Sequence, residues 1–298
     1  MNNLILVIVC LLVGLGLQRV KRFPADAAVA LNAYVIYLAL PALILLEIPK
    51  LAMDSRALLP VLAAWIIMVF TALLVFMVAR YRHWSRGVTG ALMLTVPLGN
   101  TSFVGFPLID ALLGPEAMPY AILYDQFGTF IALNTFGIAL ASFYSASDEE
   151  KPPIWKNIVS FPPFIALFIA FVVRSLNYPD WLSDVLTRLA STLVPVVMVA
   201  VGLQWRLRLA PEYVQPLAFG IVCCLLVSPL LAWFLLTLLG INGLVANVIV
   251  LEAAMPSMIS AGVLALSHNL APKLTAAMVG YSIALGICSV WLWSLILN

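Results

Sequence analysis

The sequence predicts an all-α polytopic membrane protein with about ten transmembrane helices. Of its 298 residues, 64% are hydrophobic and only 9% are charged, and the mean hydropathy is +1.11. A soluble domain of this size could not bury so much apolar surface. The apolar runs are continuous instead of alternating, which excludes a transmembrane β-barrel. At about 20 residues per span plus short loops, the length accommodates about ten spans.

The apolar segments follow one another along the chain with short polar connections. We expect spans near residues 3–19, 26–47, 57–79, 87–113, 117–143, 156–176, 181–204, 214–239, 244–268 and 272–296. The first is a retained helix and not a signal peptide, because its basic residues follow the apolar run instead of preceding it. Residues 144–155 contain the only charge run and are expected to form a cytoplasmic linker between two halves, 1–143 and 156–298.

The positive charges give the orientation. If ten spans alternate, eleven basic residues fall on one side and three on the other. The eleven are Arg19, Lys21, Arg22, Arg80, Arg82, Arg86, Lys151, Lys156, Arg206, Arg208 and Lys273, and the three are Lys50, Arg56 and Arg174. Since cytoplasmic loops carry the excess of positive charge, we place the eleven in the cytoplasm and both termini outside the cell membrane.

Five spans before the linker and five after it mean that the halves enter the membrane from opposite sides. Their sequences are faintly similar: LALPALIL at 38–45 matches TLVPVVMV at 192–199. At a constant offset of 157, Gly105 corresponds to Gly262 and Tyr124 to Tyr281. The odd number of spans in each half and these matches predict an inverted-topology repeat.

Two spans, the fourth and the ninth, are interrupted by helix-breaking residues. The first interruption is VPLGNTSFVGFPL at 96–108, in which we expect Pro97, Gly99 and Pro107 to break the helix, and the second is AAMPSMISA at 253–261. Irregular backbone at membrane depth is tolerated only where it is buried in protein or lines a wet cavity. Interrupted spans in corresponding halves therefore predict a secondary transporter with its site near the membrane midplane.

The same residues carry a resemblance to a known family. Asn100-Thr101, then Gly105 and Pro107-Leu108, form an N-T-x-x-x-G-x-P-L pattern similar to the first crossover of the auxin efflux carrier family. Ala253 to Pro256 resembles the second crossover of that family, and Leu31 to Pro41 resembles its second helix.

This resemblance implies a ten-helix fold of two inverted five-helix repeats, with helices 4 and 9 crossing at the substrate site, as in sodium/proton-antiporter-like or bile-acid-symporter-like folds. It also implies transport of organic anions. The linker is far shorter than the regulatory loop of the plant carriers, and Ser257 stands where those members have a longer amide side chain. A bacterial member that carries a small carboxylate, auxin-like or malonate-like, fits these departures better than a carrier of auxin itself.

The interrupted helices would offer a positive electrostatic end to an anion without a formal charge, because the N–H groups of each second half-helix are free of intrahelical partners. Neutral side chains would add donors and acceptors. The predicted substrate-binding residues are Asn100, Thr101, Ser102, Pro256, Ser257 and Ser260. For Thr101, Ser102 and Ser260 an alternative remains open, in which the hydroxyl only repairs the broken backbone.

Two acidic residues inside apolar spans are candidates for ion coupling. Asp125 lies in the fifth span and Glu252 lies four residues before Pro256. Ionisable residues at membrane depth are costly and are functional candidates by default. Loss of water favours the protonated form of a carboxyl group, so either residue could carry a proton through a transport cycle. The alternative for both is a permanently neutral carboxyl group that hydrogen-bonds a neighbouring helix.

The sequence lacks the motifs that would indicate several other kinds of function or partner. The chain has two histidines and contains no HExxH, GxSxG or P-loop pattern, which argues against an enzyme, a cofactor or a resident metal. It also has no basic patch that would suggest binding of nucleic acid. The expected partners are a small organic anion, membrane lipid and H⁺ or Na⁺, with a homodimer left open. Two alternatives remain beside proton- or potential-coupled transport: a sodium-coupled symporter and a membrane sensor that binds the ligand without transporting it.

Overall fold

The computed structural model describes residues 2–24, 26–51, 55–145, 158–176, 178–205, 207 and 211–297, and these residues form helices without any strand. The prediction of an all-helical protein is therefore confirmed for the part of the chain that the structure describes. The linker predicted at 144–155 lies almost wholly outside the described residues, as do Lys151, Lys156, Arg206 and Arg208.

Within the described ranges, six helical segments are long and apolar enough to cross a membrane, which agrees with a polytopic membrane protein. They are Ala27–Lys50, Arg56–Tyr81, Pro115–Tyr144, Asp180–Gln204, Pro211–Leu238 and Pro272–Leu297. Four shorter apolar helices span Leu4–Leu17, Thr101–Leu113, Pro162–Val173 and Leu244–Ala253. Two of these shorter helices belong to the spans that the sequence marks as interrupted.

One face of α4 (Leu59–Tyr81) shows how the molecule meets its surroundings. Large apolar side chains are exposed at intervals of three and four residues: Leu62, Ile66, Phe70, Leu73 and Met77, each between 44% and 58% exposed. That spacing is a single helical face. A contiguous exposed apolar stripe of this length is typical of a surface that contacts lipid.

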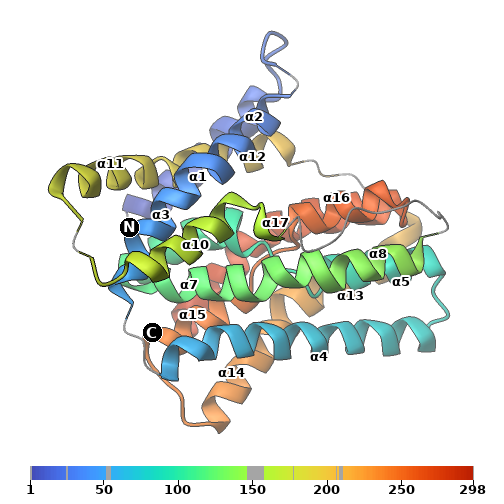
Figure 1. The fold of residues 1–298 in the computed structure, drawn as a ribbon. Helices are drawn as coiled ribbons and strands as arrows, with labels where there is room; N and C mark the ends of the chain where they lie inside the picture. The colour runs from blue at the N-terminus through green and yellow to red at the C-terminus, as the bar shows by residue number, and fades with distance from the viewer. Residues whose placement is uncertain are drawn as a thin grey trace.

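The helices pack in two groups (Figure 1). In the first group α1 packs on α12, and α3 packs on α10 and α11. Its members are α1 (Asn2–Leu17), α2 (Ala27–Tyr34), α3 (Leu40–Glu47), α10 (Pro162–Val173), α11 (Asp180–Ser191) and α12 (Leu193–Gln204). The second group contains α4, α5 (Arg86–Thr95), α7 (Met118–Leu123), α8 (Ile138–Tyr144), α13 (Val214–Val222), α14 (Ser228–Leu238), α15 (Leu244–Ala253), α16 (Ile259–Ser267) and α17 (Pro272–Leu297).

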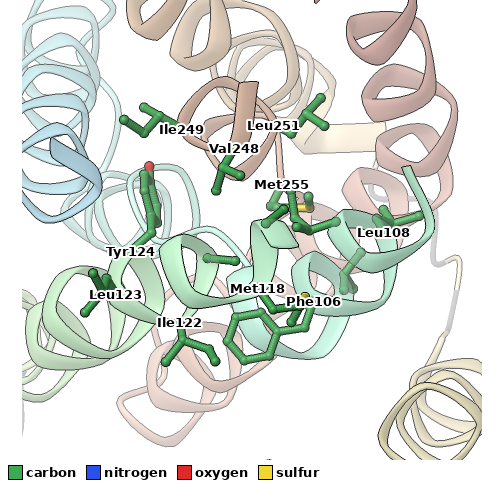
Figure 2. Close-up of a cluster of buried hydrophobic side chains, with 14 of the residues drawn as sticks. Phe106, Leu108, Met118, Ile122, Leu123, Tyr124, Val248, Ile249, Leu251 and Met255 are labelled. Atoms are coloured by element: carbon green, nitrogen blue, oxygen red, sulfur yellow. The ribbon is translucent and has the colours of Figure 1, made fainter. Parts of the chain in front are cut away.

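Helix α6 (Phe106–Leu113) joins the two groups, because it packs against α1 on one side and α15 on the other. Figure 2 shows the apolar side chains around it, where Phe106 and Leu108 lie with Met118 and Ile122 of α7 beneath the side chains of α15. Phe106 is fully buried. This packing fixes the half-helix that follows the first interruption.

Helices α1 and α12 approach closely at two glycines. A Cβ atom added at Gly14 would lie 2.9 Å from the Cα atom of Gly202 and would overlap the carbonyl oxygen of Val199. A Cβ atom at Gly202 would overlap the carbonyl oxygen of Leu11 in the same way. Small residues at a membrane helix interface allow backbones to approach, and van der Waals packing then stabilises the pair.

We expect Gly14→Val to destabilise the protein by at least about 2 kcal/mol, because the new side chain would meet backbone atoms that cannot move aside. Gly16→Val is the matched control, since no atom lies within 4 Å of a Cβ at that glycine. The measurement is the thermal midpoint of the purified proteins in one detergent. Equal midpoints for the two variants would contradict this account of the α1–α12 contact.

Five segments have the wider π-helical turn, which the sequence did not predict. They are η1 (Val35–Ala39), η4 (Thr101–Gly105), η6 (Tyr124–Phe130), η7 (Leu133–Gly137) and η9 (Cys223–Val227). Three of them directly precede a helix with proline in its first turn, namely Pro41, Pro107 and Pro229. Proline has no N–H group and clashes with the carbonyl four residues earlier, and a π turn relieves both effects. Such turns are frequent at functional sites.

Candidate functional site

The two interrupted segments meet at their interruptions. The first interruption separates α5, which ends at Thr95, from η4, and the second separates α15, which ends at Ala253, from α16. Gly99 and Ser257 form an isolated antiparallel β-bridge. The backbone N–H of Asn100 donates to the carbonyl of Pro256 (2.7 Å), and the N–H of Met258 donates to the carbonyl of Leu98 (2.9 Å). Each interruption therefore satisfies backbone groups that the other leaves open, as the interior of a membrane requires.

The predicted helix-breaking residues have different places in this arrangement. Pro97 and Gly99 lie within the first interruption. Pro107 lies in the first turn of α6, directly after η4, so the chain stays helical through it. A proline is tolerated there because the π turn η4 before it relieves the clash and the missing bond that a proline causes inside an α-helix. Pro256 lies in the second interruption, where its carbonyl accepts the bond from Asn100.

A cavity of about 430 Å³ lies beside this contact, on the side of the second half-helices. Its polar lining residues are Asn100, Ser102, Asp125, Gln126, Asn134, Ser160 and Ser260, and its apolar lining residues are Ile36, Tyr37, Leu40, Phe103, Phe130, Leu133, Phe161, Pro162 and Met258. Four of the five π-helical segments, η1, η4, η6 and η7, contribute to this wall. Among the predicted substrate-binding residues, Asn100, Ser102 and Ser260 line the cavity, and Thr101, Pro256 and Ser257 do not.

Asn100 lies in the wall of this cavity with part of its amide unpartnered. The residue is 2% exposed, and its backbone carbonyl accepts the N–H groups of Val104 and Gly105 at 3.3 and 3.0 Å. Among the described residues its amide nitrogen Nδ2 has no hydrogen-bond partner, and the same holds for Oε1 of Gln126 in the same wall. A buried polar atom left in this state costs about 1–3 kcal/mol. The wall of the cavity therefore contains one donor and one acceptor that the described residues leave without a partner.

Asp125 lies at the centre of a hydrogen-bonded cluster. The Thr101 hydroxyl donates to its Oδ1 (2.5 Å) and Gln126 Nε2 donates to its Oδ2 (2.7 Å). The hydroxyls of Thr101 and Thr129 lie 2.6 Å apart. The Thr101 hydroxyl thus donates its hydrogen bond to a carboxyl group and not to the interrupted backbone. Sequence reasoning missed Gln126 and Thr129, although they follow Asp125 by one and four residues on the same helix.

The second interruption has its own buried contacts. Ser257 is fully buried, and its N–H donates to the hydroxyl of Ser282 (3.1 Å). The Cys224 thiol lies 3.9 Å from the Ser257 hydroxyl and 3.5 Å from the carbonyl of Val96, to which it can donate. Ser257 and Cys224 therefore link the two interruptions. The four cysteines Cys10, Cys223, Cys224 and Cys288 are free thiols.

The charge balance of the 430 Å³ cavity is unusual for an anion site. Asp125 is the only ionisable side chain apart from Tyr37 among the described residues that line it, and no lysine, arginine or histidine is among them. Attraction for an anion would come from the half-helix that begins at Thr101, from α16 and from the amide of Asn100. An ionised Asp125 would oppose it. The charge of Asp125 would therefore weaken or permit the attraction that these donors offer to an anion.

Glu252 lies apart from this cavity. It lines a much smaller space of about 20 Å³ together with Val96, Gly99, Thr101, Tyr124, Thr129 and Met255, among others. Glu252 is 1% exposed, and neither carboxyl oxygen has a hydrogen-bond partner among the described residues. A Cβ atom at Gly105 would lie 2.6 Å from its Oε2, so glycine there leaves room for the carboxyl group.

The residues that could hold a metal ion are sparse in the part of the chain that the structure describes. Within the described part of the chain, no group of three or more histidine, cysteine, aspartate or glutamate side chains could hold a metal ion. Zinc and other transition metals require such sets of ligands. The site chemistry thus rests on hydroxyls, amides, backbone groups and two separate carboxyl groups.

Comparison with known proteins gives consistent results. A family model described as membrane transport protein matches residues 1–294. A protein of Methanothermobacter thermautotrophicus named as an uncharacterized transporter is 30% identical over 295 residues, which cover 98% of this chain and 96% of that protein. An uncharacterized transporter of Methanocaldococcus jannaschii is 30% identical over 311 residues, which cover 100% of this chain and 98% of the relative.

Proposed function

Because this chain belongs to the membrane transport protein family, which is that of the auxin efflux carriers, we propose that it is a secondary active transporter of small organic anions. The observation that carries the proposal is the buried amide of Asn100, whose Nδ2 has no partner among the described residues. It lies in a 430 Å³ cavity at the start of a half-helix. A carboxylate would accept from this amide and from the free N–H groups of the helix end.

The cavity favours a small carboxylate with an apolar part. Its aromatic walls, Tyr37, Phe103, Phe130 and Phe161, suit a hydrocarbon body, while the amides and hydroxyls gather around Asn100 and Asp125. Ligand sites of this size commonly combine apolar walls with a few convergent polar groups. Neutral donors hold an anion without a fixed cation, which allows its release on the other side of the membrane.

The proposed fold has ten helices in two inverted five-helix repeats, residues 1–143 and 156–298, with the interrupted fourth and ninth helices crossing. Its support is the β-bridge between the two interruptions and the sequence offset of 157. At this offset Asn100 corresponds to Ser257 and Asp125 to Ser282. The side chain of Asp125 accepts a hydrogen bond from the Thr101 hydroxyl, beside the first interruption. The side chain of Ser282 accepts one from the backbone N–H of Ser257, in the second interruption.

The two packing groups suggest how access could alternate. Ile36, Tyr37 and Leu40, together with Pro162, belong to the first group, whereas Asn100, Asp125 and Ser260 lie in segments that contact the second. A substrate held by the second group would be carried past the first by an elevator-like or rocking movement, so that the cavity faces the two sides in turn.

Flux and binding together test the proposed function. Purified protein is screened for binding of mono- and dicarboxylates, and the best ligand is then followed into proteoliposomes against protein-free liposomes. We expect saturable uptake of a small carboxylate that excess unlabelled anion competes. Binding without flux would favour the membrane sensor and defeat the transporter proposal. Neither binding nor flux for any anion would defeat both.

The inverted repeat makes a prediction about topology in the cell membrane. Tags at the two termini are expected to react with an impermeant reagent on intact cells, because five spans in each half place both ends outside. A tag inserted between residues 148 and 149 of the linker is the internal control and should react only after permeabilisation. A protected terminus would contradict the repeat.

A further inference from the structure

The small cavity at Glu252 differs in electrostatic character from the cavity at Asn100. It is lined by the residues that follow the first half-helices: Val96, Pro97 and Gly99 after α5, and Ala253 and Met255 at the end of α15. The C-terminal end of a helix carries partial negative charge and carbonyl groups without intrahelical partners. The large cavity faces helix N-termini, and the small cavity faces helix C-termini.

An ionised Glu252 would add a full negative charge to that negative end. It lies in the last turn of α15, 1% exposed, and neither of its carboxyl oxygens has a hydrogen-bond partner among the described residues. A buried carboxylate with no compensation costs several kcal/mol. No lysine, arginine or histidine is among the described residues that line the cavity. An ionised Glu252 would therefore have no positive side chain beside it among the described residues of this lining.

We propose that this cavity binds one sodium ion. Its volume of about 20 Å³ exceeds the roughly 10–15 Å³ that a single water requires, so one small ion fits. Glu252 would supply the carboxylate, Thr101 and Thr129 their hydroxyl oxygens, and the interrupted backbone its carbonyls. Unwound carbonyls and half-helix C-terminal ends are the groups that coordinate sodium in transporters with interrupted helices.

A proton on Glu252 would fit these contacts less well. It would neutralise the charge and its O–H could donate to one backbone carbonyl, but the second carboxyl oxygen would still need a partner. It would also leave the negative helix ends uncompensated. A cation contacts the carboxylate, the hydroxyls and the backbone carbonyls at the same time, and therefore accounts for all of these groups together.

The sodium site would be connected to the anion cavity through Thr101. This residue lines the small cavity, and its hydroxyl donates to Asp125, which lines the large one. An ion that draws on the Thr101 oxygen would change the hydrogen bond that Asp125 receives. The coupling role rests on the proposed function, and it would make the carrier a sodium-linked one, whereas binding of the ion does not depend on transport.

The test measures the thermal midpoint of the full-length protein in detergent without any organic anion. Sodium chloride replaces choline chloride at constant total salt and constant pH. We expect a saturable rise, roughly 5 °C at a sodium concentration 100 times Kd. Glu252→Gln is expected to abolish the rise, and Glu252→Asp, which keeps the charge but shortens the side chain, to weaken sodium affinity at least about 10-fold.

Glu47→Gln is the matched control. Glu47 is also a buried glutamate, but its Oε1 already accepts a bond from Lys50 at 2.8 Å, so this variant should keep the full response to sodium. No rise in the wild-type protein, or a full rise in Glu252→Gln, would overturn the proposal. If Glu252→Gln does not fold, unchanged affinity in Glu252→Asp overturns it equally. Binding of the organic anion is measured separately in choline buffer. Failure of the sodium site is therefore distinguishable from failure of the proposed function.

Discussion

Replacement of Asn100 by alanine is expected to weaken binding of the carboxylate substrate by about 10- to 100-fold. Hydrogen bonds to charged groups contribute roughly 1.5–3 kcal/mol, and each 1.4 kcal/mol corresponds to a factor of ten in affinity. The fold should tolerate the change, because Asn100 Nδ2 makes no hydrogen bond to the described residues. Binding of the best ligand from the carboxylate screen, measured on purified protein, checks this expectation.

Asn134→Ala is the matched control for this prediction. Asn134 lines the same cavity, but its Nδ2 already donates to the carbonyl of Phe130 (2.9 Å). One of its two N–H donors is therefore occupied, and we expect a loss of affinity well below that of Asn100→Ala. Equal affinities for the wild-type protein and Asn100→Ala would remove Asn100 from the site. Equal losses in the two variants would show that cavity shape, and not the free donor, decides affinity.

The second large effect is expected at Asp125. An ionised Asp125 about 6 Å from a bound anion would repel it by about 3 kcal/mol at an effective dielectric constant near 20, which is roughly a 100-fold effect. Protonation removes this repulsion, so wild-type uptake should rise as the pH falls. Asp125→Asn is neutral at every pH and should show a flat profile over the same range.

The measurement is initial uptake into proteoliposomes between about pH 5.5 and pH 8.5, with a substrate that stays ionised throughout. Asp110→Asn is the matched control, because Asp110 is an aspartate in a span that lines a different cavity. It should keep the wild-type profile. If Asp125→Asn also keeps it, Asp125 has a structural role and its cluster with Thr101 and Gln126 only holds the helices together.

Local features of the sequence were sufficient to locate the interruptions. Pro97, Gly99 and Pro256 break helices by their own chemistry, whatever surrounds them. Asn100, Asp125 and Glu252 stood out because polar groups at membrane depth are costly. The structure places Asn100 and Asp125 in one cavity and Glu252 in another. The cost of burying a polar group was thus enough to identify these three residues as candidates. It could not show which of them share a cavity.

The sequence by itself determined the class of protein, the interrupted spans and the buried polar residues, because each follows from composition or from local backbone chemistry. Only the tertiary structure decided that Thr101 bonds Asp125, that Ser257 lies outside the large cavity, and that Glu252 faces helix C-termini. The physical reason is that lipid and protein interior are equally apolar. An apolar span therefore gives little sign of which face meets another helix, so contacts between residues 24 or more positions apart have to be read from the packing.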